Sequence, residues 1–545
     1  MKPYKFSFSV FLAIVVVSVF LVTFGCGTTA PPTHEAEYDV IVIGAGMGGL
    51  SAGAHLAASG LKVLVLEQHH KVGGCTTNFS RGAFVFDTAL HEMAGGGPGR
   101  ADRGLYQLHK LCGVDEYVEL YELPEFYRSV YPNGLDITLG NTWEKWDSTL
   151  GEQWPEEAEG IDKFHTLCSS FMNEMLSLRD LFRMTGVEAF FTKMKVPMKQ
   201  KILFEWKDRT IQDLMDECFT DEKLKAVVSQ LWVYYGAPVP YASCLLLLSA
   251  TDSYLTDGIW HVKGTSQALS DGYEMLIRKL GGKVKTDTLV TEIIIEDGIA
   301  TGVVTEYGDV YTGRYVVCNT DPYQMIFNLI GEENLPAGYV AKIRNMEPAN
   351  SLFGVYMGLN VDLAERGYND TELFVNTSLD SVVMHDNMMS GNFSEGGVSI
   401  TIYTNFGDPI YAPEDKGMSV VVLHAYSDYD IWPMDKGEYR DMTEEKAQEL
   451  ISLAATVIPE LANPAYIEEM EIITPVTLKE FTMNHDGVVY GFYLSPDQWE
   501  KIPNNTPIDN VFIASNWTQA WHGVSGCQIN GWRAARLILD IEGIE

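Results

Sequence analysis

Hydrophobic residues gather first in a run near the start of the chain. The run is densest from Val10 to Phe24 and follows two lysines, Lys2 and Lys5. A basic start followed by an apolar run is typical of a secretory signal peptide or a membrane anchor, so residues 1–33 are left out of the fold prediction. The run is at the short end of the about 20 apolar residues that a membrane-spanning helix needs.

A second pattern begins at Tyr38, where apolar and β-branched residues form the short run YDVIVI. This run, from Tyr38 to Ile43, predicts a buried strand. Leu50 to Gly60 has the composition of a helix that stops at a glycine, and Lys62 to Leu66 (KVLVL) predicts a second strand. Strand, helix and strand in this order predict a βαβ unit.

Three glycines join the first strand to the helix. Gly44, Gly46 and Gly49 fit the pattern G-x-G-x-x-G. Gly44 allows the tight turn, Gly46 lets the backbone approach a pyrophosphate, and Gly49 lets the helix pack close to the strand. The helix N-terminus supplies amide donors for phosphate, so the segment predicts a dinucleotide site.

An acid and a second pair of glycines follow the βαβ unit. Glu67 stands at the end of the second strand, about 20 residues after the glycines, where a carboxylate can accept hydrogen bonds from ribose hydroxyls. Gly73 and Gly74 come just after this acid, which distinguishes flavoproteins of this type from simple nicotinamide dehydrogenases. We therefore predict FAD as the cofactor.

Composition narrows the partners and the architecture. The 545 residues, 46% of them apolar, are enough for two interleaved domains. The formal net charge of −36 repels phosphate backbones, so we expect no nucleic acid partner. None of the 8 cysteines forms a C-x-x-C pair, and we predict no metal site.

Three further segments extend the pattern that starts at Tyr38. They are GTSQALSDG with the residues that follow it, VVCNTDP, and NVFIASNWTQAWHGVSGCQINGWRAAR. With the dinucleotide segment, they resemble the phytoene desaturase, carotenoid isomerase and retinol saturase family of FAD-dependent oxidoreductases. The resemblance implies a Rossmann-like α/β FAD-binding domain (a GR2-type flavoprotein) with an interleaved α+β substrate domain. We expect the FAD-binding domain at 36–99, 261–344 and 481–545, and the substrate domain at 100–260 and 345–480.

The resemblance also implies further cofactor-binding residues. The backbone of Val290 would contact the adenine ring, and Asn516 would hydrogen-bond near the ribityl chain. Gly523 and Val524 would lie in a turn that opens a helix beneath the isoalloxazine. Asn516 replaces the usual aspartate, and Ala-Trp-His at 520–522 departs from the usual Pro-Gly turn, close to the reactive face of the flavin.

The chemistry that the resemblance implies is desaturation, saturation or cis–trans isomerisation of a long apolar polyene, a carotenoid or retinoid-like lipid. Any acid or base should lie near the flavin, and His522 is the first candidate and His91 the second. Tyr234 to Leu255 is apolar enough to line a lipid pocket, but a buried core helix explains most of its residues equally well.

Two features favour contact with a membrane. Gly25 and Cys26 resemble the lipobox of bacterial lipoproteins, with an uncleaved signal anchor as the alternative, and the lysines before the apolar run place the main body outside the cytoplasm. Phe190 to Trp206 alternates lysines with apolar residues. It forms either the mouth of a lipid entry path at a membrane surface or an ordinary amphipathic helix.

Two other functions remain open at this stage. One is an amine-oxidase-like flavoenzyme, although no amine site can be placed from the sequence. The other is a lipoprotein that binds FAD and lipid without net redox chemistry. A second complete dinucleotide fingerprint is missing from the sequence, so the electron acceptor or donor stays unidentified.

Overall fold

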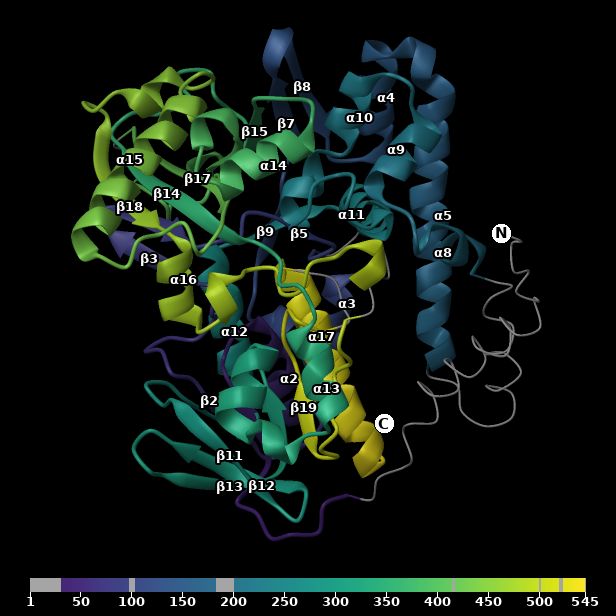
Figure 1. Ribbon diagram of the computed structural model, residues 1–545, viewed down its shortest axis with the longest axis vertical. Helices are drawn as coiled ribbons and strands as arrows, with labels where there is room; N and C mark the ends of the chain where they lie inside the picture. The colour runs from purple at the N-terminus through teal and green to yellow at the C-terminus, as the bar shows by residue number, and fades with distance from the viewer. Residues whose placement is uncertain are drawn as a thin grey trace, which may run out of the picture.

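The computed structural model describes residues 31–97, 103–182, 200–413, 417–498, 501–518 and 523–544. Two seven-stranded sheets form its framework, and they lie toward opposite ends of the long axis (Figure 1). Helices cover both sheets, and a short sheet lies between them.

The first sheet has the parallel core of a Rossmann-like fold. Its strand order is β10 (Lys283–Lys285), β2 (Val63–Leu66), β1 (Tyr38–Ile43), β13 (Val310–Cys318), β12 (Ile299–Thr305) and β11 (Val290–Glu296), with β19 (Val511–Ile513) also paired to β13. Neighbours from β10 to β13 and the β13–β19 pair are parallel, whereas β12 and β11 pair antiparallel. Residues 40–42 of β1 are fully buried, as expected for a strand covered on both faces.

The predicted βαβ unit is confirmed. β1 has the predicted bounds, and β2 begins one residue later than predicted. The helix between them, α2 (Met47–Ala58), begins directly after Gly46, three residues earlier than the sequence suggested. It starts earlier because Gly48 and Gly49 lie inside its first turn.

Glycines let α2 pack against the last helix of the chain, α17 (Gly523–Glu542). A Cβ at Gly531 of α17 would collide with the carbonyl oxygen of Gly48, and a Cβ at Gly48 would collide with that of Ala514. α12 (Thr265–Lys279) also contacts α2. The C-terminal end of the chain is thereby held against the dinucleotide segment.

The second sheet is mixed. Its order is β18 (Ile467–Ile473), β14 (Ser351–Leu359), β17 (Ser419–Ser427), β16 (Gly397–Ile402), β15 (Glu372–Asn376), β7 (Glu125–Tyr131) and β8 (Leu135–Gly140). Among the strand pairs that the structure describes in this sheet, β15 and β7 are parallel and all the others are antiparallel. Its helices are α14 (Ser381–Met389), α15 (Lys436–Ala454) and α16 (Pro475–Thr482).

Further helices pack beside the second sheet and share its core. They are α4 (Trp143–Gln153), α5 (Ala158–Phe182), α8 (Lys201–Trp206), α9 (Ile211–Cys218), α10 (Glu222–Val228) and α11 (Cys244–Asp257), preceded along the chain by α3 (Leu105–Cys112). The basic, apolar stretch at 190–206 reaches this region: its last six residues form α8, and residues 190–199 lie outside the described ranges. A separate helix, α13 (Ala337–Arg344), lies beside the first sheet.

A three-stranded sheet connects the two halves. It consists of β5 (Met93–Ala94), β9 (Ile259–Val262) and β6 (Leu120–Glu122). A two-stranded hairpin of β3 (Asn78–Arg81) and β4 (Phe84–Asp87) directly precedes β5 in the sequence. The predicted domain limits at 99/100 and 260/261 fall beside or inside this sheet. The exact limits therefore stay a prediction.

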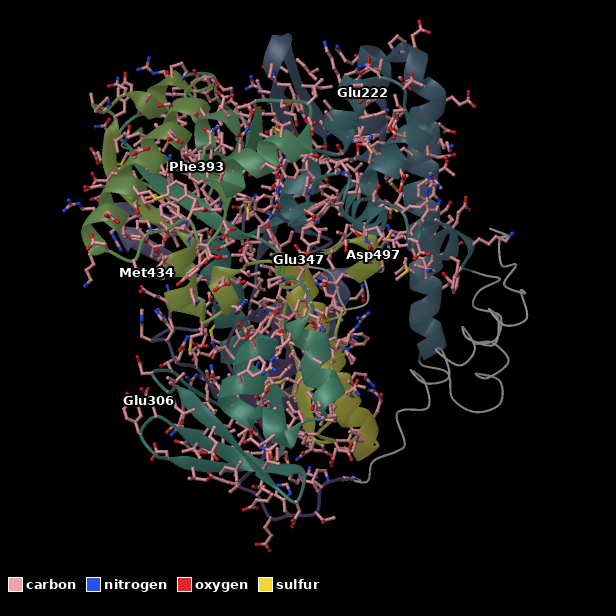
Figure 2. All side chains as sticks on the ribbon, in the orientation of Figure 1. Glu222, Glu306, Glu347, Phe393, Met434 and Asp497 are labelled. Atoms are coloured by element: carbon pink, nitrogen blue, oxygen red, sulfur yellow. The ribbon has the colours of Figure 1, made fainter. Side chains whose placement is uncertain are left out.

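The surface carries the negative charge. Glu222, Glu306, Glu347 and Asp497 are exposed and lie at well-separated places, whereas Phe393 is buried in the upper core (Figure 2). Within the described ranges, no helix is both long and apolar enough to cross a bilayer. The apolar run at residues 10–24 is outside those ranges.

Candidate active site

A cavity of about 1020 Å³ extends from the glycine turn after β1 to the second sheet. It is lined by the ends of β1, β2 and β13, by the loops after them, and by β14, β15, β16 and β17. The carboxyl ends of parallel strands are where open α/β sheets bind ligands. The cavity therefore joins a dinucleotide-type site to a chamber at the second sheet.

The glycine turn has the shape that the motif predicts. Gly44 has a φ of +92°, and Gly46 and Gly44 line the cavity. A Cβ at Gly46 would lie 2.5 Å from Oδ1 of Asn319. Gly49 is not among the cavity-lining residues, because it packs against the backbone of Gly44, where a Cβ would collide.

Gly73 and Gly74 close the other side of this turn. Their φ angles are +125° and +59°, and both line the cavity. The amide of Gly73 donates to the carbonyl of Ala45 over 2.8 Å, and a Cβ at Gly74 would lie 3.3 Å from the Cα of Gly46. Side chains at these positions would fill the space next to the turn.

Glu67 lies at the end of β2 and lines the cavity. Its carboxylate accepts hydrogen bonds from the amides of Ala45 (2.6 Å) and His69 (2.8 Å). Burial raises the pKa of Glu67 above its usual value, and these two amides oppose that shift. A carboxylate has about four lone-pair sites, so two remain for ribose hydroxyls.

The remaining residues expected at the cofactor lie along the same cavity. Val290 begins β11 and is buried in the cavity wall. Asn516 follows β19, and its Nδ2 donates to the carbonyl of Val489 over 2.6 Å. Gly523 and Val524 begin α17 and line the cavity, whereas His522 lies outside the described residues.

Several buried polar atoms of cavity-lining residues lack hydrogen-bond partners among the described residues. Oδ1 of Asn516 and Oγ1 of Thr320 are two of them. Thr320 directly follows Asn319, whose Nδ2 donates to the carbonyl of Ala514 over 2.6 Å. Unsatisfied buried polar atoms that line a cavity indicate a ligand with donors of its own.

His91, the second candidate acid or base, lies in a polar cluster of the cavity. Its Nδ1 is 3.0 Å from Oε2 of Glu372 and 3.3 Å from the hydroxyl of Tyr234. The Tyr234 hydroxyl donates to Oε1 of Glu372 over 3.2 Å, and the Thr401 hydroxyl donates to Oε2 over 2.7 Å. Burial lowers the pKa of His91, but the adjacent Glu372 outweighs it, and the pKa is raised overall. The cluster therefore holds an ionisable imidazole at the cavity wall.

Glu92 follows His91 and differs from Glu372 in its contacts. It is 8% exposed and lines the cavity, and neither of its carboxyl oxygens has a hydrogen-bond partner in the described part of the chain. Burial raises the pKa of Glu92 to about 8. An unsatisfied buried polar group costs about 1–3 kcal/mol.

Sequence reasoning found His91 but missed its partners. Glu372 and Tyr234 are far from His91 in sequence, and only the fold brings them together. A local signal for Glu92 did exist. It stands next to a candidate histidine in the largely apolar segment FDTALHEMAGG, and a glutamate in such a segment is buried more often than an average glutamate.

The segment from Tyr234 to Leu255 meets both expectations for it. Tyr234, Tyr235, Leu246, Ser249, Ala250, Ser253 and Tyr254 line the cavity. Leu245, Leu247 and Leu248 are buried in the core and do not line it. One face of α11 thus forms the chamber wall and another packs inside.

Comparison with known proteins identifies the family. Residues 47–539 match the family of flavin containing amine oxidoreductases. The chain belongs to this family. It is an FAD-dependent oxidoreductase with FAD as its cofactor, and the predicted fold class, cofactor and enzyme class are confirmed.

Individual relatives of this flavoenzyme cover most of its length. Prolycopene isomerase 1 of an Oncidium hybrid cultivar is 26% identical over 96% of this chain and 87% of its own. All-trans-retinol 13,14-reductase of Danio rerio is 23% identical over 88% of this chain and 82% of its own. The structure of putrescine oxidase with putrescine bound is 16% identical to this chain, with a TM-score of 0.61 over 93% of this chain and 99% of its own. This similarity shows the shared fold alone.

The site of this flavoenzyme fits FAD. Gly44, Gly46 and Gly74 leave room at the N-terminus of α2 for a pyrophosphate, and Glu67 has free lone pairs for a ribose. The unpartnered oxygen of Asn516 lies in the same cavity, where it can accept a hydrogen bond. Bound FAD supplies hydride transfer, while the protein supplies position and polarity.

Proposed function

We propose that this flavoenzyme acts on a long apolar polyene, a carotenoid or retinoid-like lipid, by desaturation, saturation or cis–trans isomerisation. The observation that carries the proposal is the cavity, which continues from the dinucleotide turn into a chamber rich in apolar side chains. The apolar side chains that line the chamber are those of Trp232, Val233, Leu246, Ala250, Leu352, Phe374, Met388, Val398, Ala425 and Ile472. Two relatives with polyene or retinoid names, which cover most of the chain, support it.

In this proposal the protein's residues bind, orient and exclude water. The apolar chamber takes the hydrocarbon chain, because burying it removes apolar surface from water. Glu372 and Tyr234 hold the imidazole of His91 at the wall, where it takes up or releases a proton near the reacting carbons. His522 stays a candidate for the same role.

The test uses purified holoprotein lacking residues 1–33. A carotene, a cis-carotene and all-trans-retinol are each added without oxygen, once to the oxidised and once to the chemically reduced protein. Flavin absorbance and chromatography of the extracted lipid are followed. Flavin reduction with a new double bond, flavin oxidation with a lost one, or a changed isomer ratio each support the proposal. Unchanged flavin and unchanged lipid in every case refute it.

An amine-oxidase-like function is the second candidate, because a buried carboxyl group lines the cavity beside aromatic side chains and a second one lies behind the cavity wall. Glu92 lines the chamber with Tyr234 and Tyr254, and Glu372 is hydrogen-bonded to the Tyr234 hydroxyl without lining the chamber itself. A cationic amine can pair with carboxylates and contact aromatic faces. Flavin reduction by putrescine or an alkylamine in the same assay, with no response to polyenes, selects this function. FAD content with no redox response to either class selects a non-redox FAD- and lipid-binding role.

We further propose that the protein is exported and attached to a membrane surface through its first 33 residues. The basic start, the apolar run and Cys26 support this. Fatty-acid labelling of the expressed chain, with Cys26→Ser as the control, separates lipidation from an uncleaved anchor. Labelling that Cys26→Ser abolishes marks a lipoprotein; a membrane-bound but unlabelled protein marks an anchor. A protein found wholly in the soluble cytoplasmic fraction contradicts both.

A further inference from the structure

Glu92 stands apart from the other buried glutamates near the chamber. Glu372 is hydrogen-bonded to Tyr234 and Thr401. Glu157, equally buried but away from the cavity, accepts hydrogen bonds from the amides of Thr220 (2.9 Å) and Asp221 (2.7 Å). Glu92 has the same burial, lines the cavity and has no hydrogen-bond partner within the described ranges. An unsatisfied carboxyl group at a cavity wall is therefore available to a ligand.

The surroundings of Glu92 favour its neutral form. Burial is the main cause, and the charge of Glu372 adds to it, whereas the charge of His91 and the nearby Tyr254 hydroxyl, which does not meet hydrogen-bond geometry, favour ionisation; the pKa of Glu92 is raised to about 8. The phenols of Tyr127, Tyr234 and Tyr235 also lie within electrostatic range. At neutral pH most molecules thus present a carboxylic acid, with one O–H donor and one carbonyl acceptor.

We propose that Glu92 binds a hydroxyl group on an otherwise apolar substrate and makes the enzyme select hydroxylated polyenes over hydrocarbon ones. The inference rests on the proposed polyene function and adds the position of a specificity-determining residue. A hydroxyl both donates and accepts, so it can satisfy both oxygens of a neutral carboxyl group. A hydrocarbon leaves both oxygens unsatisfied. A site that hydrogen-bonds a hydroxyl group rejects the analogue without that group more strongly than a purely apolar pocket separates the two molecules.

An amine is the competing ligand chemistry at this position. An ammonium group has donors and no acceptor, so it needs Glu92 ionised. The carboxylate of Glu372 does not supply a free charge, because it is already shared by His91, Tyr234 and Thr401. The hydroxyl is therefore the ligand that these contacts favour, and the amine is an outcome that the test separates.

The experiment measures binding to oxidised holoprotein without turnover. The probes are all-trans-retinol, the same polyene with hydrogen in place of the hydroxyl, and the same polyene with a primary amine. Dissociation constants come from quenching of tryptophan fluorescence, without oxygen, for wild type, Glu92→Leu, Glu92→Gln and the control Glu157→Gln. Glu157→Gln changes an equally buried glutamate outside the cavity.

We expect wild type and Glu157→Gln to bind the alcohol at least about tenfold more tightly than the hydrocarbon. Glu92→Leu should reduce this ratio to about one and keep or improve hydrocarbon binding. Glu92→Gln should retain part of the preference, because a neutral amide also donates and accepts. An alcohol preference that survives in Glu92→Leu overturns the proposal. Tightest binding of the amine in wild type, lost in Glu92→Gln, also overturns it in favour of an amine site.

Melting temperatures show whether the variants fold. The binding results for wild type then distinguish failure of the proposed polyene function from failure of the proposed role of Glu92. Without ligand, Glu92→Leu should raise the melting temperature, since it removes an unsatisfied buried group, whereas Glu157→Leu should lower it by removing hydrogen bonds. A lowered melting temperature for Glu92→Leu contradicts an unsatisfied carboxyl group. If wild type binds none of the three probes, the proposed polyene function fails; if it binds all three equally well, only the role of Glu92 fails.

Discussion

His91 remains ionisable inside an apolar chamber because its polar partners come from other parts of the fold. Glu372 lies on β15 of the second sheet, and Tyr234 lies before α11. The nearby His424 has no acidic partner within the described ranges, and burial followed by the charge of His91 lowers its pKa to about 3. The carboxylate of Glu372 thus makes the difference between two buried imidazoles.

Glu372→Gln should shift the pH profile of turnover. Removing the carboxylate lowers the pKa of His91, because Glu372 is the main group that raises it. His91 then loses its proton at a lower pH, and the corresponding limb of the rate profile moves to lower pH with a roughly tenfold or greater loss of maximal rate. Flavin content, read from absorbance, should be unchanged. An unmoved pH limb would remove His91 from the proton transfer.

Glu92 should make stability fall as the pH rises. Its pKa is about 8 in the folded protein and 4.5 in its usual surroundings, so the folded state retains a proton that the unfolded state releases. Between these two values rising pH therefore favours unfolding. Urea titrations at several pH values should show wild type losing stability relative to Glu92→Gln across this window, by a few kcal/mol at most. A pH-independent difference would show that the folded protein does not raise the pKa of Glu92.

Gly46→Val should give a colourless protein. The new Cβ would lie against Oδ1 of Asn319, and its methyl groups would occupy the space next to the turn where a pyrophosphate must approach. The visible spectrum and the cofactor released on denaturation give the result. Circular dichroism checks that the chain has folded. A folded variant that holds stoichiometric FAD would refute the fingerprint assignment.

At the scale of elements, local pattern was enough wherever a signal lay within a few residues. The strands of the βαβ unit and its helix follow from runs of apolar residues and glycines, whereas the strand that carries Val290 was expected only from the family resemblance. The start of α2 was missed because glycines inside a helix look like a turn in sequence. The His91–Glu372 contact was missed because it joins a loop residue between β4 and β5 to the first residue of β15, far away in the chain, and no spacing rule encodes that.

Gly531→Ala should destabilise the contact between α2 and α17. The added Cβ would collide with the Gly48 carbonyl and crowd Ser51, so we expect a loss of about 1–3 kcal/mol. Gly151→Ala is the matched control, because a Cβ there meets nothing within 4 Å and α4 should gain up to about 1 kcal/mol. Thermal and chemical unfolding measure both. Equal effects of the two substitutions would mean that the helices do not pack as described.

At the scale of the whole molecule, we expect the first 33 residues to be separable from the fold. Among the side-chain hydrogen bonds of residues 31–544 that the structure describes, those with the first sheet begin at His34, which hydrogen-bonds the carbonyl of Gly313, and continue at Glu37, whose amide donates to Thr312. Length, composition and charge predicted a large, acidic protein with two interleaved domains. They held no information on where the two halves meet, because that depends on β5, β9 and β6 pairing across the chain.

Deletion of residues 1–33 should leave a protein that folds and binds FAD. The contacts of His34 and Glu37 are kept, and none of the cavity-lining residues is removed. Melting temperature and FAD content of the truncated protein, compared with those of detergent-extracted full-length protein, test this. A truncated protein that aggregates or stays free of flavin would show that the N-terminal segment supports the fold.

The position of β19 and α17 has a consequence for biosynthesis. These elements are far from the glycine turn in sequence, yet they lie against β13 and α2, and Asn516, Trp517, Gly523 and Val524 form one wall of the cavity that starts at Gly44. A nascent polypeptide lacks this wall until residues 511–527 have been synthesised and have left the ribosome. We therefore expect flavin to be enclosed only after these residues pack against the dinucleotide segment, and a premature stop codon before Val511 to yield a product that lacks this wall, however much of the second sheet it has formed.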